Sequence, residues 1–337
     1  MPWYHGLVKV GVIGLGFMGA THLNAFRAID GVEIAAVSST NPRALAGDLR
    51  GAGGNLGREA GVFDFSAIEK FTEWRALVRD QAVDAVDICL PTHLHLEAAT
   101  LALEAGKHVL VEKPMALDAA QCDAILEVAS RSKKVFMVAQ VLRFWPEYIA
   151  LREFLRACGN APIREATFFR RCGMPDWSAW LSDESRSGGA VLDLLVHDID
   201  QTLHLFGLPD SVSARGLGPV DTLNASLHYT DGMSVSIQGG WYPAGMPFAM
   251  GFHVSTDQGG MDLKDGVLSE KTNGDWCHIA SPPGDAYQAE LAYFIDCCRA
   301  GRSPGECLPL ESARAVKLAL LLKESRRQGG TTLSCTI

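Results

Sequence analysis

The first part of the chain alternates short apolar runs with longer amphipathic stretches. The apolar runs have the length of buried strands, about 4–8 residues, and fall at residues 8–13, 32–39, 85–90, 108–111 and 135–139. Helices are predicted between them, among them residues 96–105, which Gly106 closes. Strands that alternate with helices predict an α/β fold with a doubly wound parallel sheet.

The pattern changes in the second part of the chain. Helices are predicted at residues 148–157, 190–203, 287–299 and 311–326, and a strand at 163–170. From residue 211 to 268, strand-like segments separated by glycine, aspartate and proline follow one another without regular helices, which favours an antiparallel sheet. We expect a first domain at residues 1–125 and an α+β domain at 126–337, with the C-terminal helices packing back toward the first.

A glycine-rich turn follows the first predicted strand. Gly14, Gly16 and Gly19 have the G-x-G-x-x-G spacing, and residues 20–26 can form a helix. The first glycine makes the tight turn, the second lets the backbone approach a pyrophosphate, and the third lets helix and strand pack closely. The expected cofactor-binding residues of this turn are Gly14, Gly16, Phe17, Met18 and Gly19. The alternative is an ordinary tight turn between a strand and a helix.

The end of the second predicted strand bears on the choice of nicotinamide cofactor. An acid about 20 residues past the glycines would bind the ribose 2′-hydroxyl of NAD. Ser39 and Thr40 stand there instead, and Arg43 follows. Hydroxyl groups and a guanidinium suit a 2′-phosphate, so we expect NADP, with NAD as the second choice. In the alternative, Ser39 and Thr40 only cap a helix and Arg43 is solvated.

Polar residues also follow two later strands. Pro91, Thr92 and His95 come after the strand at 85–90, and Glu112 and Lys113 come after the strand at 108–111. Strand ends of open α/β sheets face the ligand crevice, so these residues are candidates for cofactor contacts. Lysine is rarely buried without a partner, and Lys113 is expected to point into that crevice. His95 could equally be a first-turn residue of its helix with no ligand role.

Asp193 and His197 are four residues apart in a predicted helix and would share one face. A histidine titrates in the range that proton transfer needs, although a single histidine on a helix is commonly structural. The nearby Asp198 and Asp200 diverge in direction along a helix, so we expect no metal site. Candidates for substrate contact are Lys113, Arg143, Trp177, Asp193 and His197. Trp180 and Arg170 or Arg171 could line the same pocket, or the tryptophans could pack in the core.

Composition excludes several classes of function. The chain has 337 residues and a net charge of −9, which gives no general basic surface for nucleic acid or an anionic membrane. Its nine cysteines form no C-x-x-C pair and suggest a reducing compartment. Residues 1–6 show no basic region followed by an apolar core, so no signal peptide is expected. We therefore expect a cytoplasmic protein that binds a small molecule.

The order of three features resembles one family. The glycine turn, Glu112-Lys113-Pro114 and Asp193-x-x-x-His197 together resemble the glucose–fructose oxidoreductase and inositol dehydrogenase family, Gfo/Idh/MocA. The segments 143–148 and 287–294 are also similar to that family. The resemblance implies a Rossmann domain, an α+β domain with a large open sheet, and a homodimer or homotetramer formed through that sheet. It also implies nicotinamide-dependent oxidation or reduction of sugars, inositols and related polyols.

The resemblance also implies roles for three residues. Lys113 matches the family lysine that contacts the reacting hydroxyl, His197 the proton-transferring histidine, and Asp193 the acid that assists it. The chemistry agrees, because hydride removal from a secondary alcohol requires a base that takes the hydroxyl proton. Alternatives are a dehydrogenase or reductase of a dihydrodiol, aldehyde or imine, and a non-catalytic NAD(P)-binding sensor.

Overall fold

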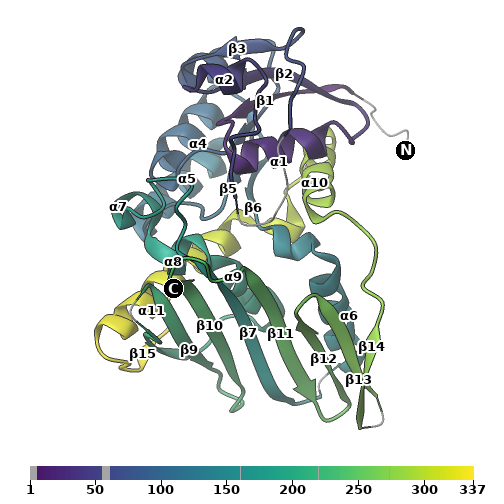
Figure 1. Ribbon diagram of the computed structural model, residues 1–337, viewed down its shortest axis with the longest axis vertical. Helices are drawn as coiled ribbons and strands as arrows, with labels where there is room; N and C mark the ends of the chain where they lie inside the picture. Colours follow the sequence, from purple (N-terminus) through teal and green to yellow (C-terminus); the bar gives the residue numbers. More distant parts are fainter. Residues whose placement is uncertain (1–5, 55–60, 160, 219, 273) are drawn as a thin grey trace. The chain divides into compact units, whose positions relative to one another are not determined.

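The computed structural model describes residues 6–54, 61–159, 161–218, 220–272 and 274–337. Two compact units divide the chain (Figure 1): unit 1 is Met1–Val141 with Ala286–Ala313, and unit 2 is Leu142–Asp285 with Arg314–Ile337. Residues 1–5, which contribute to the expectation of no signal peptide, lie outside the described residues. No helix among the described residues combines the length and the apolar character that crossing a bilayer requires.

Unit 1 alternates strands and helices. Its elements are β1 (Val8–Ile13), α1 (Phe17–Phe26), β2 (Val32–Ser38), α2 (Pro42–Leu45), β3 (Glu69–Phe71), α3 (Trp74–Arg79), β4 (Ala85–Ile88), η1 (Thr92–Leu94), α4 (His95–Glu104), β5 (His108–Glu112), α5 (Ala119–Arg131), β6 (Phe136–Ala139), α10 (Ala286–Ala300) and η3 (Gly305–Cys307).

The six strands of unit 1 form one parallel sheet in the order β3-β2-β1-β4-β5-β6. This confirms the predicted doubly wound parallel sheet. β4 and β6 are buried on both faces, as parallel strands covered by helices must be. The strand order reverses between β1 and β4, and in such sheets ligands bind outside the carboxyl ends of the strands at the reversal.

A late segment of the chain completes unit 1. Helix α10 packs against α1 and β1, and the Arg299 guanidinium donates to the carbonyl oxygens of Asp30 and Gly31. The division at 141 differs from the boundary expected after residue 125, because β6 pairs with β5 and therefore belongs to the first sheet.

Unit 2 contains a large sheet and the helices that cover it. Its elements are η2 (Val141–Phe144), α6 (Pro146–Cys158), β7 (Ile163–Gly173), α7 (Glu184–Ser187), α8 (Gly189–Asp193), α9 (Val196–Phe206), β8 (Ser211–Arg215), β9 (Thr222–His228), β10 (Ser234–Tyr242), β11 (Ala249–Thr256), β12 (Gly259–Lys264), β13 (Val267–Thr272), β14 (Asp275–Ile279), most of α11 (Pro309–Arg327) and β15 (Leu333–Ser334).

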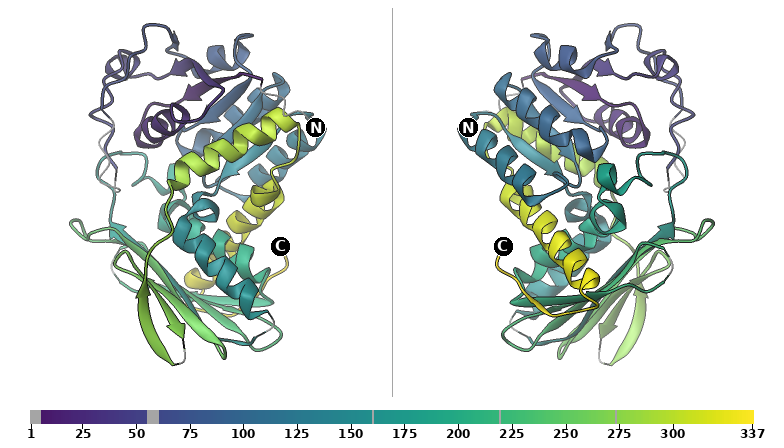
Figure 2. Two further views of the ribbon diagram at one scale, coloured as in Figure 1. Left: turned by 90° about the vertical axis from the view of Figure 1, so that its right-hand side faces the viewer. Right: turned by 90° about the vertical axis from the view of Figure 1, so that its left-hand side faces the viewer.

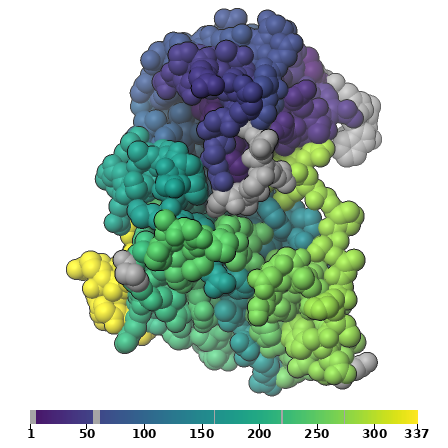
Figure 3. Space-filling model, viewed as in Figure 1, coloured from purple at the N-terminus to yellow at the C-terminus, as the bar shows by residue number. Residues whose placement is uncertain are grey.

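The nine strands have the order β14-β13-β12-β11-β7-β10-β9-β8-β15. All neighbours are antiparallel except β7 and β10, which confirms the mostly antiparallel sheet. The helices of unit 2 lie on one side of it (Figure 2), and α9 contacts β7 and β10. Figure 3 shows the β12–β14 end in light green at the surface.

The helix predicted at residues 190–203 is wrong in one respect, because the chain forms two helices there. α8 ends at Asp193 and α9 begins at Val196. The N–H groups of Leu194 and Leu195 both donate to the carbonyl oxygen of Ala190. The second of these bonds spans five residues, which widens the turn between α8 and α9.

Candidate functional site

Two glycines of the turn after β1 are required by the fold itself. Gly14 has a φ of +92°, and a Cβ there would lie 2.5 Å from the carbonyl oxygen of Cys89. A Cβ on Gly19 would overlap the carbonyl oxygen of Gly14. These contacts agree with the tight turn and the close helix–strand packing expected of the first and third glycines.

Gly16 is different, because the fold leaves space around it. Among the described residues, a Cβ on this exposed glycine would meet no atom within 4 Å, and its φ is −81°. In the described part of the chain, no side chain caps the α1 end that starts with Phe17 and Met18, and its first turn contains no acidic residue. Unpaired N–H groups and the positive end of the helix dipole attract phosphate. The residues present therefore fit the diphosphate of a dinucleotide.

The segment after β2 settles how α2 is capped. Asn41 Oδ1 accepts the N–H of Arg43 at 3.0 Å, and Ser39 Oγ accepts the N–H of Asn41 at 3.1 Å. Asn41 is therefore the cap, and the alternative in which Ser39 and Thr40 cap the helix is wrong. Thr40 is exposed.

Two arginines share one carboxylate beside this segment. Arg43 Nη2 lies 3.1 Å from Asp48 Oδ2, and Arg50 Nε lies 2.8 Å from Asp48 Oδ1. The hydrogen bond from Arg50 and then that from Arg43 hold the pKa of Asp48 well below its usual range. The group keeps a net positive charge, which suits a phosphate. Arg50 was not among the sequence candidates, because only its side-chain contact with Asp48 associates it with Arg43.

The structure assigns His95 to the interior of unit 1. Its side chain is buried, with Nδ1 2.8 Å from the Pro114 oxygen and Nε2 2.8 Å from the Leu90 oxygen. Because backbone carbonyls face both ring nitrogens, His95 holds the chain together, and the expected ligand contact is not supported. Thr92 is also buried, whereas Pro91 is partly exposed.

Glu112 and Lys113 differ in exposure. Glu112 closes β5 and is buried, and its Oε2 accepts the Lys113 N–H at 2.9 Å. The Lys113–Pro114 peptide bond is cis, and Lys113 is partly exposed. Burial by itself raises the pKa of Glu112, but the hydrogen bond and charge of His22, with Lys113, bring it below its usual value. Glu112 is therefore a charged interior anchor at the end of the strand that leads to Lys113.

Asp193 and His197 lie on either side of the turn between α8 and α9. Both are partly exposed, while Leu194, Leu195 and Val196 between them are buried. Leu194 packs with Cys172, Ala190 and Trp241, which fixes the turn against β7 and β10. The packing therefore leaves these two polar side chains as the accessible ones in a buried segment.

Arg143 lies in the interior of unit 2. Its side chain is fully buried and binds both carboxylate oxygens of Asp200. Asp198 is likewise buried against Arg170, with Arg170 Nε 2.7 Å from its Oδ2. The expected substrate contact of Arg143 is therefore not supported, because no solute reaches a fully buried guanidinium. Asp198 and Asp200 form separate ion pairs with different arginines.

The predicted pocket residues near the end of β7 have different environments. Trp177 is 40% exposed, and Trp180 is half-buried. Arg170 is buried in its ion pair, while Arg171 is exposed. The exposure of Trp177 is incompatible with core packing.

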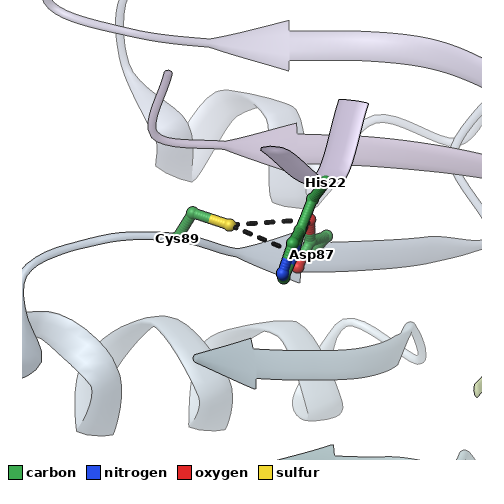
Figure 4. Close-up of side chains that lie close together, drawn as sticks. All are labelled: His22, Asp87 and Cys89. Carbon is green, nitrogen blue, oxygen red and sulfur yellow. Dashed lines mark hydrogen bonds and ion pairs between the residues drawn. The ribbon is translucent and has the colours of Figure 1, made fainter. Parts of the chain in front are cut away.

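A buried group in unit 1 escaped the sequence analysis. In the part of the chain that the structure describes, the ligand atoms of His22, Asp87 and Cys89 lie within 4.8 Å of one another (Figure 4). Burial raises the pKa of the Cys89 thiol, and zinc would require a thiolate. The group is therefore better suited to hold a proton than a metal ion. The one sign of this group in the sequence was Asp87, a charged residue inside the otherwise apolar strand β4.

Family models match both parts of the chain. A model described as "Oxidoreductase family, NAD-binding Rossmann fold" matches residues 8–140. A second, described as "GFO/IDH/MocA C-terminal domain", matches residues 149–261. Together they cover more than half of the chain.

Similar proteins include sugar and inositol dehydrogenases. Levoglucosan dehydrogenase of Pseudarthrobacter phenanthrenivorans is 31% identical over 215 residues, 61% of this chain and 53% of that protein. An NADP(+)-dependent scyllo-inositol 2-dehydrogenase of Bacillus subtilis is 25% identical over 248 residues, 71% of this chain and 65% of that protein. The alignments thus span less than two thirds of these relatives.

A solved structure extends the likeness of the fold. Levoglucosan dehydrogenase in complex with NADH and levoglucosan superimposes with a TM-score of 0.83 at 20% identity, covering 98% of this chain and 100% of that one. The two family models, the parallel sheet with its glycine turn, and the nine-stranded sheet lead to one assignment. The chain belongs to the Gfo/Idh/MocA family of oxidoreductases, with an NAD(P)-binding Rossmann fold in its N-terminal part.

Proposed function

We propose that the protein is an NAD(P)-dependent dehydrogenase or reductase of a secondary alcohol or ketone in a sugar, inositol or related polyol. The space at Gly16 is the observation that carries the proposal, because the fold does not require a glycine there and a pyrophosphate would. Family membership and the relatives' names support the polyol class.

The proposed cofactor residues lie in unit 1. The turn with Gly14, Gly16 and Gly19 would hold the diphosphate, and Pro91 and Lys113 would lie toward the nicotinamide. Arg43 and Arg50 favour NADP, because two guanidiniums in the segment that follows β2 suit a 2′-phosphate. Ser39 and Thr40 would add hydroxyl contacts. When bound, the nicotinamide supplies the hydride acceptor or donor.

The proposed catalytic residues are Lys113, Asp193 and His197. His197 would take the proton of the substrate hydroxyl during oxidation and return it during reduction. The Lys113 ammonium would stabilise the negative charge that develops on the same oxygen. Asp193 would support the charged form of His197, and Trp177 would offer an aromatic face to the substrate.

The first test is cofactor binding followed by turnover. Energy transfer from tryptophan to bound NADPH or NADH gives both dissociation constants. A panel of inositols, glucosides and anhydrosugars with either oxidised cofactor then reports reduction of the nicotinamide. We expect tighter NADPH binding and turnover of at least one polyol. Binding of neither cofactor would overturn the proposal, and binding without turnover of any polyol, dihydrodiol, aldehyde or imine would favour a sensor.

We also propose a cytoplasmic homodimer or homotetramer associated through the nine-stranded sheet. The side of this sheet that carries no helices of unit 2 supports the association (Figure 2). The nine cysteines, none of which is in a disulfide, support a reducing compartment. Light scattering of the purified protein gives the oligomeric state, and a monomer would contradict the first part.

A further inference from the structure

A buried histidine connects helix α1 to the strand that precedes Lys113. His22 is fully buried, its Nδ1 is 2.9 Å from Asp87 Oδ2, and its Nε2 is 3.2 Å from Glu112 Oε1. Asp87 is fully buried and Glu112 nearly so. Figure 4 shows the side chain of His22 beside those of Asp87 and Cys89.

The protonation of this group follows from its geometry. A neutral imidazole has one N–H, so it can donate to only one of the two carboxylates. The imidazolium carries an N–H on each ring nitrogen and balances one of their two negative charges: Nδ1 hydrogen-bonds Asp87, and Nε2 makes an ion-pair contact with Glu112. Burial lowers the pKa of His22, but the Asp87 charge and hydrogen bond, together with Cys89, raise it well above the usual value. His22 is therefore a buried cation between two carboxylates.

Glu112 links the His22 side chain to the backbone of Lys113. Its Oε1 faces His22, and its Oε2 accepts the Lys113 N–H at 2.9 Å. Because both oxygens are engaged, the carboxylate fixes the peptide group just before Lys113. Removal of His22 would leave Glu112 buried without its compensating cation, which is costly enough to move or protonate a carboxylate.

A second buried histidine holds the other side of Lys113. His95 Nδ1 lies 2.8 Å from the oxygen of Pro114, and Nε2 lies 2.8 Å from the oxygen of Leu90. Leu90 follows Cys89, whose sulfur contacts His22 Nδ1 at 3.5 Å. Burial lowers the pKa of His95, so its neutral ring donates to one of these two carbonyl oxygens and only faces the other. The residues immediately before and after Lys113 therefore both contact a buried imidazole.

We propose that His22, acting through Glu112, and His95, acting through Pro114, are positioning residues for Lys113. This inference rests on the proposed function only for the catalytic role of Lys113. The two imidazoles hold the backbone on both sides of the lysine. The side chain that ends in the ammonium group therefore extends from a rigid backbone. Reacting groups displaced by about 1 Å can lose roughly 10²-fold in rate.

The test combines crystal structures with kinetics. His22→Gln and Glu112→Gln are compared with wild type and with His108→Asn, which removes a partly buried histidine at the opposite end of β5. We expect the Lys113 backbone to move by more than about 0.5 Å in the first two variants and kcat to fall roughly 10²-fold. Cofactor dissociation constants should change little. In a Lys113→Met background, His22→Gln should have almost no further effect on kcat.

Several outcomes would overturn the inference. One is a folded His22→Gln protein with Lys113 in place and kcat unchanged. Another is an equal loss of kcat in His108→Asn, which would mean a general loss of order. One equivalent of zinc in the purified protein would replace the proposed imidazolium with a metal site. If the wild-type protein turns over no polyol but Lys113 still moves in the variants, the positioning role is supported. The proposed function is then wrong.

Discussion

Arg143 and Asp200 form a two-point ion pair inside unit 2, with donor–acceptor distances of 2.8 and 2.7 Å. Both side chains are at most 1% exposed. Together with Arg170 and Asp198, this pair anchors α9, the helix that carries His197, to η2 and β7. The two buried ion pairs therefore orient the helix, while the His197 side chain stays partly exposed.

Asp200→Asn should destabilise the protein by about 3–5 kcal/mol, because it leaves the buried Arg143 charge uncompensated. Urea unfolding gives the change in the free energy of unfolding. Asp257→Asn is the matched control, since it breaks an exposed two-point pair with Arg164 and should have little effect. Equal losses in the two variants would contradict the interior role of the Arg143 pair.

Gly16→Ala should leave the melting temperature unchanged and weaken NADPH binding at least roughly tenfold, about 1.4 kcal/mol. The added methyl group meets no atom of the residues that the structure describes, but it would occupy the space proposed for the diphosphate. Gly19→Ala should instead destabilise the fold, because its Cβ would overlap the Gly14 carbonyl. Gly305→Ala, whose nearest neighbour would be the Tyr293 hydroxyl at 3.9 Å, should alter neither quantity. Unchanged NADPH affinity in Gly16→Ala would remove the main support for the cofactor site.

Lys113→Met should reduce kcat by roughly 10²–10⁴-fold while cofactor binding stays close to wild type. The methionine keeps the length of the side chain and removes only the charge and the donors. Lys133→Met, at an exposed position of the same unit, is the control and should be active. Normal turnover in Lys113→Met would exclude the proposed role of the ammonium group.

The double variant Arg43→Ala/Arg50→Ala should weaken NADPH binding by roughly an order of magnitude and NADH binding much less. The physical reason is that only NADPH offers a 2′-phosphate to the two guanidiniums. The two dissociation constants from tryptophan energy transfer decide the matter. Equal losses for both cofactors would place these arginines elsewhere on the dinucleotide, and no loss would make them surface residues.

His22 should make the free energy of unfolding fall as the pH rises above neutral. Its folded pKa is raised above the unfolded value of about 6.5, so its contribution is complete below that value and is lost as pH rises through the folded pKa. Unfolding free energies of wild type and His22→Gln should therefore converge as pH rises. Parallel curves above neutral pH would show that the buried imidazole is not charged in the folded protein.

The sheet and the glycine turn could be predicted because their signals are local. Apolar runs give the strands of unit 1, and the spacing of Gly14, Gly16 and Gly19 gives the turn. The break after Asp193 could not be predicted, because Leu194, Leu195 and Val196 are all buried and an apolar run shows no helical period.

The partners of the buried polar side chains could not be predicted from the sequence for a different reason. Asp200 lies far along the chain from Arg143, and Glu112 lies far from His22, so only the folded chain brings each pair together. The sequence therefore made Arg143 a candidate for substrate contact and His95 a candidate for cofactor contact. In both cases the polar atoms are directed at groups of the chain itself.

Helix α10 belongs to unit 1 but is synthesised after most of unit 2. Its Arg299 binds the carbonyls of Asp30 and Gly31, and its Tyr287 ring lies 6.3 Å from the ring of His22. Domains commonly fold on the ribosome as soon as their sequence has emerged, the N-terminal one first. Here one helix of unit 1 is made only after the segment Leu142–Asp285 of unit 2. A nascent chain halted before residue 286 therefore lacks the helix that packs against α1, and unit 1 is complete only after most of unit 2 has been synthesised.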